Sequence, residues 1–181
     1  MRVISVLALL IALPLAACGG GGDTAAAEDP NFNQTDVRFS EMMRPHHLQA
    51  VRNAEAEIER GSDPRVKRLA QMIRRSQIEE AAQLQQFQRT FGKQQMPAAP
   101  DQQARWDENH AELAAASGAR ADVIFLTNMI PHHAAALPMA QLELDQGAYG
   151  PAKKLAGQIK QAQLSEIKEM KAIVREKAAG N

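Results

Sequence analysis

The 181-residue chain contains one cysteine, Cys18, which excludes an internal disulfide framework, a thiolate zinc cluster and a CxxC redox pair. Aromatic residues make up only 4% of the chain although hydrophobic residues reach 45%, so its core must consist mainly of aliphatic side chains. Such a core favours packed helices over a sheet sandwich, and no stretch has the pattern of a strand. Lys plus Arg (21) equals Asp plus Glu (21), so there is no excess positive charge to attract nucleic acid.

The first residues are typical of an export signal. Arg2 precedes the apolar run 3–15, which is too short to span a bilayer as a stable helix. Leu15-Ala16-Ala17-Cys18 resembles a bacterial lipobox, so we expect a lipoprotein signal peptide over residues 1–17 and lipidation of Cys18. Residues 18–35 are rich in Gly, Ala and acidic residues and predict a flexible tether. This pattern predicts an exported lipoprotein, held by its lipid anchor at the periplasmic face of a bacterial membrane or at the cell surface. The alternative is a plain secretory signal.

The remainder of the chain contains one motif twice. Shifting the sequence by 86 residues aligns 39–87 with 125–173 without a gap, and 15 of the 49 pairs are identical. About three identities are expected by chance, so we interpret the two segments as a duplication.

Capping residues and breakers predict that each copy is a helical hairpin. In the first hairpin, over residues 36–92, Asp36 is expected to cap a helix that ends at Gly61, and Ser62-Asp63-Pro64 opens the second helix. The second hairpin covers residues 119–178, with its turn at Gly147, and a partly helical connector covers 93–118. Because neither hairpin can bury its apolar face alone, we predict an all-α four-helix bundle over residues 36–181. Prolines precede both histidine pairs, so an alternative is that helices begin at Pro45 and Pro131.

Four of the five histidines lie in two Met-x-Pro-His-His motifs. A thioether at position i and imidazoles at i+3 and i+4 share one helical face, and sulfur beside imidazole suits copper, as Cu(I) or Cu(II), better than calcium or magnesium. Met139, beyond His132 on the helix that carries the second motif, is expected to extend the second site. The predicted metal ligands are Met43, His46, His47, Met129, His132, His133 and Met139.

Polar residues on the second helix of each hairpin are expected at the same height as the histidines. They lie about as many residues after the turn as the histidines lie before it, and they predict hydrogen-bond partners for the imidazoles. Carboxylates commonly support ligating histidines in this way. The alternative is a buried polar network without metal that only fixes helix register. These predicted supporting residues are Gln77, Glu80, Gln163 and Glu166.

Other residues receive simpler interpretations. Met42 and Met72 are expected to fill gaps in the core. Asp107 and His110 on the connector form a weak candidate ligand pair. The recurring residues Glu57 and Glu143 lie about three turns from the histidines and are expected to form salt bridges at the helix ends.

Phe-x-x-x-Met-x-Pro-His-His-x-x-Ala, present at residues 39–50 and 125–136, resembles the signature of the bacterial domain-of-unknown-function family numbered 305. The resemblance covers nearly everything from Asp36 onward. It implies a ferritin-like four-helix bundle and an exported protein, and the family includes periplasmic copper-binding proteins with Met and His ligands. The predicted ligand positions match the family's, but Asn53 stands where a Met is usual.

Three functions remain open at this point. The first is a non-catalytic protein that buffers copper or exchanges it with a copper-donor or copper-acceptor protein. The second is a structural or interaction bundle of the cell envelope. The third, a ferritin-like di-iron oxidase, requires Glu-x-x-His ligands, and no Glu-x-x-His occurs in the sequence.

Overall fold

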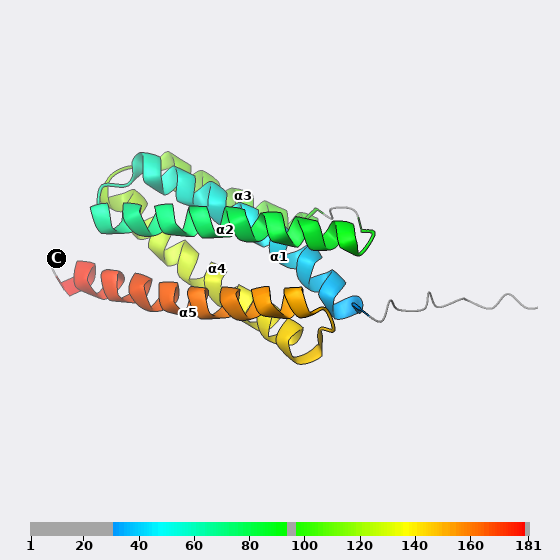
Figure 1. The fold of residues 1–181 in the computed structure, drawn as a ribbon. Coiled ribbons are helices and arrows are strands. Elements are labelled where there is room, and N and C mark those ends of the chain that lie inside the picture. Colours follow the sequence, from blue (N-terminus) through cyan, green and yellow to red (C-terminus); the bar gives the residue numbers. More distant parts are fainter. Residues whose placement is uncertain (1–30, 94–96, 180–181) are drawn as a thin grey trace, which may run out of the picture.

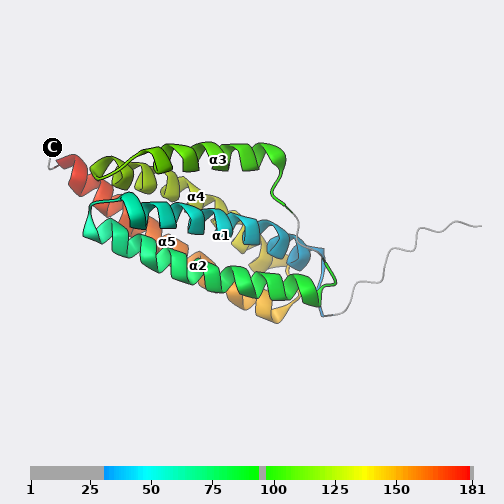
Figure 2. The ribbon, with the colours of Figure 1, turned by 90° about the horizontal axis from the view of Figure 1, so that it is seen from above.

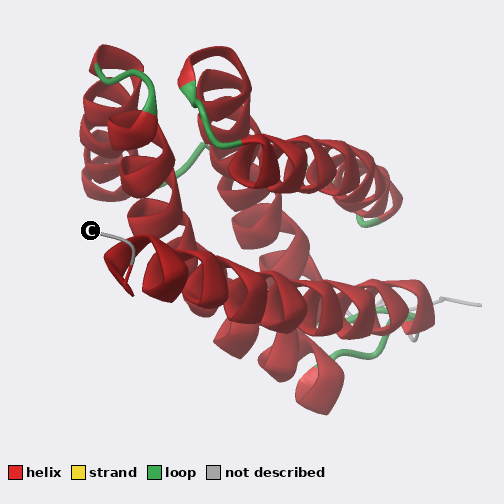
Figure 3. Cartoon of the chain, turned by 90° about the vertical axis from the view of Figure 1, so that its left-hand side faces the viewer, coloured by secondary structure: helices red, strands yellow, loops and turns green. Residues whose placement is uncertain are grey.

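The computed structural model describes residues 31–93 and 97–179. Within these residues the chain forms helices joined by short loops and no strand (Figures 1 and 3). The predicted all-α class is therefore confirmed. The predicted signal peptide, Cys18 and most of the tether lie outside the described residues. The helices are α1 (Gln34–Arg60), α2 (Pro64–Thr90), α3 (Pro100–Ala115), α4 (Ala119–Gln146) and α5 (Gly150–Ala179).

Helix α1 begins three residues earlier than predicted. Asn33 caps it by accepting hydrogen bonds from the backbone N–H groups of Thr35 and Asp36, and the Asp36 carboxylate accepts from the Asn33 N–H. The expected capping role of Asp36 is therefore wrong, because Asp36 is the third helical residue of a capping box. At the next turn the prediction holds, since Asp63 caps α2 and Pro64 is its first residue.

The prolines do not start helices. Pro45 lies inside α1, and Pro131 and Pro138 lie inside α4. An internal proline costs a helix about 3 kcal/mol, but here each helix buries side chains on both sides of its prolines, and this packing offsets the lost backbone bond.

The two hairpins, α1 with α2 and α4 with α5, pack through their first helices. The N-terminal end of α1 lies beside the C-terminal end of α4, and the C-terminal end of α1 lies beside the N-terminal end of α4. Helices α1 and α4 are therefore antiparallel. Helix α3 lies along α1 and α4 (Figure 2). In residues 31–93 and 97–179, no helix is long and apolar enough to cross a membrane.

The turn within each hairpin requires glycine because a larger side chain would collide with a buried carboxyl group. A Cβ atom at Gly61 would lie 2.0 Å from Glu57 Oε1, and one at Gly147 would lie 2.3 Å from Glu143 Oε1. Neither glycine has a positive φ, so the requirement comes from the buried carboxyl group that folds against each turn.

We expect Gly61→Ala to lower the free energy of unfolding by about 1–3 kcal/mol, the usual range for overpacking. Gly150→Ala is the matched control, because nothing lies within 4 Å of a Cβ at that position. Urea denaturation of both variants measures the difference, and equal midpoints would contradict this explanation of the turn.

Candidate metal centre

The four histidines of the two motifs meet where α1 crosses α4. The rings of His46 and His132 stack, with their centroids 3.7 Å apart and an interplanar angle of 28°. His47 and His133 follow on the same helices, with ring centroids 6.3 Å from His46 and 6.1 Å from His132 respectively. The fold therefore brings both motifs to one place, which the sequence left open.

Each hairpin supplies a carboxylate to its own inner histidine. Nε2 of His47 lies 2.8 Å from Oε2 of Glu80, and Nε2 of His133 lies 2.7 Å from Oε2 of Glu166. Both imidazoles are fully buried. If each Nε2–H donates to its carboxylate, the lone pair of each ring remains on Nδ1. These contacts orient the inner rings as a carboxylate behind a metal-ligating histidine does.

These residues form a polar layer within an otherwise apolar core. One hydrophobic cluster lies toward the Gly61 end and contains Met129, and the other lies toward the Gly147 end and contains Met43. The two methionines are fully buried and precede the histidines by three and four residues, so each lies on the helical face of its own pair. We call the polar residues between the clusters the histidine layer: His46, His47, His132, His133, Gln77, Gln163, Glu80 and Glu166.

Many buried polar atoms of the histidine layer have no hydrogen-bond partner. Unpaired imidazole nitrogens are Nδ1 of His46, His47 and His133 and both ring nitrogens of His132. The side-chain amides of Gln77 and Gln163 are also unpaired, so the structure does not show the hydrogen bonds that we expected them to make to the imidazoles. Because buried polar groups in proteins are almost always paired, this concentration of free donor atoms indicates a place for a ligand.

Burial lowers the pKa of His46, His47 and His132 and so keeps these imidazoles neutral. Burial, together with the neighbouring His47 and His133, lowers the pKa of His46 to about 3, and burial beside His133 lowers the pKa of His47 to about 3 as well. The pKa of His132 is also well below its usual value, chiefly through burial. Burial and then the charge of Glu166 raise the pKa of Glu80 to about 7. Neutral imidazole is the form that binds metal ions.

Helix α3 covers one side of the histidine layer. The edge of the Trp106 ring approaches His46, with centroids 6.1 Å apart, and Trp106 lies 6.5 Å from His132. Beside Trp106 a cavity of about 230 Å³ reaches His46 and His132 and is lined by amides that include Gln49 and Asn128. His132 as a whole is partly exposed although both of its ring nitrogens are buried, so this cavity reaches the edge of the histidine layer.

Several predicted residues lie elsewhere. Met139 lines a groove with Met42, and no histidine lines that groove. Met42 and Met72 are each 53% exposed, so their expected role in core packing is wrong. Within the described residues, no three His, Cys, Asp or Glu side chains are arranged to hold a metal ion.

The connector residues do not form a ligand pair. Asp107 pairs with the Arg52 side chain, while His110 Nδ1 donates to Asn53 Oδ1 over 3.1 Å.

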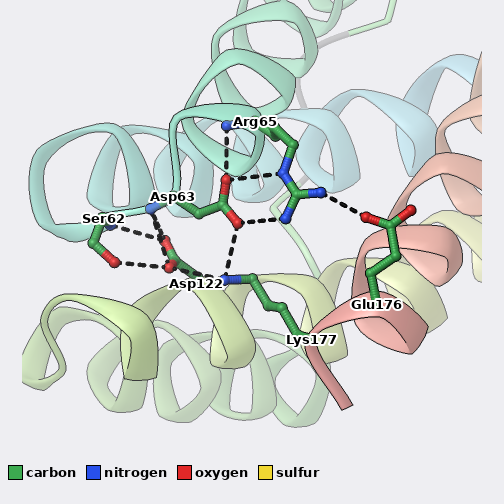
Figure 4. A network of polar contacts seen from close by, with 6 residues as sticks. All are labelled: Ser62, Asp63, Arg65, Asp122, Glu176 and Lys177. Carbon is green, nitrogen blue, oxygen red and sulfur yellow. Dashed lines mark hydrogen bonds and ion pairs between the residues drawn. The ribbon is translucent and has the colours of Figure 1, made fainter. Parts of the chain in front are cut away.

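Sequence reasoning missed the role of two buried aspartates, Asp36 and Asp122, each of which joins its own hairpin to the turn of the other. Asp122 on α4 accepts backbone N–H groups from Ser62 and Asp63 in the first turn, and Asp36 on α1 accepts those of Ala148 and Tyr149 in the second turn (Figure 4 shows the first network). The signal was available, because Asp36 and Asp122 are also 86 residues apart, just before the aligned segment.

The buried glutamate that precedes each turn faces one of these aspartates. Burial and the adjacent Asp122 raise the pKa of Glu57 to about 8, and burial and Asp36 do the same for Glu143. The helix-end salt bridges expected for Glu57 and Glu143 are therefore wrong, because each glutamate shares a buried site with another carboxyl group.

The fold and the site define a class of protein: an all-α bundle of two hairpins with a buried histidine layer at their junction. The model of the domain of unknown function DUF305 matches residues 36–174, and the chain belongs to this family, as its motifs predicted.

Solved structures agree with this family. A DUF305 fragment from Deinococcus radiodurans is 29% identical, with a TM-score of 0.73 over 80% of this chain and 97% of that chain. A putative secreted DUF305 protein from Streptomyces coelicolor is 25% identical, with a TM-score of 0.72 over 80% and 94% of the two chains. CopM in its Cu(I)-bound form is 32% identical, with a TM-score of 0.67 over 80% and 98%. No curated protein matches the chain significantly.

Proposed function

We propose that this protein binds copper through the histidine layer, with the buried methionines as additional ligands, and that it stores or passes on the ion without catalysing a reaction. The observation that carries the proposal is the group of unpaired imidazole nitrogens buried at the α1–α4 crossing. Copper accepts imidazole and thioether ligands together, in contrast to magnesium or calcium. The similar protein CopM, solved with Cu(I), Cu(II) and Ag, supports this choice.

The chain's own residues have separate roles in this proposal. His46 and His132 face the cavity and would be the first imidazoles that an entering ion meets, whereas His47 and His133 are fixed from behind by Glu80 and Glu166. Met43 and Met129 would supply sulfur from either side. Because the rings stack, binding requires His46 and His132 to turn apart.

Copper binding is tested by competition against a Cu(I) chelator of moderate affinity. We expect the wild-type protein to withdraw Cu(I), and His46→Ala/His132→Ala to weaken binding at least 100-fold while the far-ultraviolet circular dichroism remains helical. The single tryptophan, Trp106, lies next to both rings, so Cu(II) should quench its fluorescence in the wild type only.

His110→Ala is the matched control, since His110 lies outside the histidine layer and contacts Asn53. Equal copper affinity in the double variant and the wild type would reject the proposal. That outcome would favour the second candidate, a structural bundle of the cell envelope, which the stacked rings and the absence of a ready-made metal cluster in the described residues support.

We also propose that the protein works outside the cytoplasm, attached to a membrane through lipidated Cys18. The lipobox-like tetrapeptide and the putative secreted relative from Streptomyces coelicolor support this location. Labelling cells with a fatty-acid analogue should mark the wild-type protein and not Cys18→Ser, which should appear in the soluble fraction. Unlabelled wild-type protein in the soluble fraction would contradict the lipid anchor and would favour the alternative of a plain secretory signal.

A further inference from the structure

A groove lined only by residues of α1 and α4 brings together two methionines that are distant in sequence. It lies between the first half of α1 and the second half of α4 and has a volume of about 280 Å³. We call it the methionine groove. Its lining includes Met42 from α1 and Met139 from α4, with Phe39, Pro138, Leu142 and Arg38 around them.

The corresponding positions on the other side of the α1–α4 crossing differ in chemistry. Shifted by 86 residues, Met42 corresponds to Asn128 and Met139 to Asn53. Helix α3 covers that side, and there Asn53 accepts a hydrogen bond from His110. The side with amides is thus covered by the chain itself, whereas the side with thioethers is open to solvent.

The exposure of Met42 is unusual for a methionine that only fills space. More than half of its side chain is accessible, and its three rotatable bonds allow the sulfur to move toward Met139 across the groove. Thioether sulfur binds soft ions such as Cu(I) and Ag(I) and discriminates against hard, oxygen-preferring cations. The groove contains no carboxylate, and the guanidinium of Arg38 at its edge disfavours doubly charged ions.

We propose that Met42 and Met139 form a separate, weak and exchangeable site for a soft monovalent ion, Cu(I) or Ag(I), at the protein surface. This site is distinct from the histidine layer, because Met139 lies seven residues, or about 10 Å along the helix, beyond His132. Two neutral sulfur ligands at an open groove give fast exchange, which suits an ion that is being received or released. The proposal does not require the histidine layer to bind copper.

The test uses the full chain with ¹³C-labelled methionine methyl groups and Cys18→Ser, so that no thiolate competes. Silver nitrate is the probe, because Ag(I) is a redox-stable soft monovalent ion. We expect the methyl resonances of Met42 and Met139 to shift together, and Met42→Leu to weaken the silver affinity observed at Met139 at least tenfold. Met139→Leu should have the reciprocal effect on Met42.

Met72 provides the matched control within the same molecule. It is as exposed as Met42 and also lines a surface cavity, but no second methionine lines that cavity. Met72 should therefore not shift at silver concentrations that saturate Met42 and Met139, and Met72→Leu should leave their affinity unchanged. Silent Met42 and Met139 resonances, or a Met139 response that survives Met42→Leu, would overturn the proposal. Failure of the histidine layer would instead appear as unchanged Met43, Met129 and Trp106 signals.

Discussion

Replacing Asp122 with alanine should lower the free energy of unfolding by about 3–5 kcal/mol, the cost of removing one partner of a buried charged network. The Asp122 carboxylate accepts the Ser62 N–H over 2.9 Å, the Ser62 hydroxyl over 3.0 Å and the Asp63 N–H over 3.1 Å. Lys177 also approaches it, at 3.3 Å (Figure 4). The variant would leave two turn amides and one ammonium without this partner. Thermal and urea denaturation measure the loss.

Ser62→Ala is the control for Asp122→Ala. It removes one hydroxyl contact but keeps both backbone hydrogen bonds, so we expect a loss below about 1 kcal/mol. Although burial opposes ionisation, the amides of Asp63 and Ser62 hold the pKa of Asp122 below its usual value, so the carboxylate is charged at neutral pH. If Asp122→Ala were no less stable than Ser62→Ala, the proposed joining of the hairpins at this network would be refuted.

Raising the pH from 7 to 9.5 should destabilise the metal-free protein by about 3 kcal/mol. The pKa of Glu57 and of Glu143 is about 8 in the folded protein and 4.5 in the unfolded chain, so the folded state holds the extra protons. The stability that these protons provide is complete below pH 4.5 and is lost as the pH rises through 8. Over this interval each glutamate contributes about 1.4 kcal/mol.

Glu57→Gln/Glu143→Gln separates this effect from general alkaline unfolding. The amides cannot ionise, so we expect the stability of the double variant to stay nearly flat over the same interval. The groups facing Glu57 are Asp122, Lys67 and Lys177, and those facing Glu143 are Asp36 and Lys153. Urea midpoints at each pH give the comparison, and parallel curves for wild type and variant would contradict the assignment.

Burial of the histidines makes the stability of the protein change with pH in the opposite direction. The lowered pKa values of His46 and His47 mean that the unfolded chain binds protons first, so stability falls as the pH drops below 6.5 and continues to fall toward 3. The histidine and glutamate contributions therefore oppose each other between pH 4.5 and 6.5, and above pH 6.5 only the loss from the glutamates remains.

The sequence was sufficient for the helices and for the depth of the histidines. The helix cap and the turn depend only on neighbouring residues, so the sequence predicted them correctly from Gly61, Asp63 and Pro64. Helical spacing placed His46 and His47 on the buried face. The distance of Glu80 from the turn correctly placed it beside His47. These inferences needed only helix geometry within one hairpin.

Relations between the hairpins were not predictable in the same way. The stacking of His46 on His132 depends on how α1 crosses α4, and no local pattern specifies that crossing. The position of α3 determines that Asn53 is covered and Met42 is open, so the exposure of Met42 also required the structure. Glu57 was predicted to form a helix-end salt bridge because its actual neighbour, Asp122, lies on the other hairpin and no pattern within the first hairpin reveals it.

The reciprocal placement of Asp36 and Asp122 has a consequence for the order of folding. The backbone amides of each turn are satisfied by an aspartate 59 to 113 residues away, on the first helix of the opposite hairpin. Neither half can therefore complete its own loop, and a polypeptide truncated after residue 92 should remain only partly structured. Such long-range closures slow the final step of folding, so we expect the two halves to dock and become rigid together.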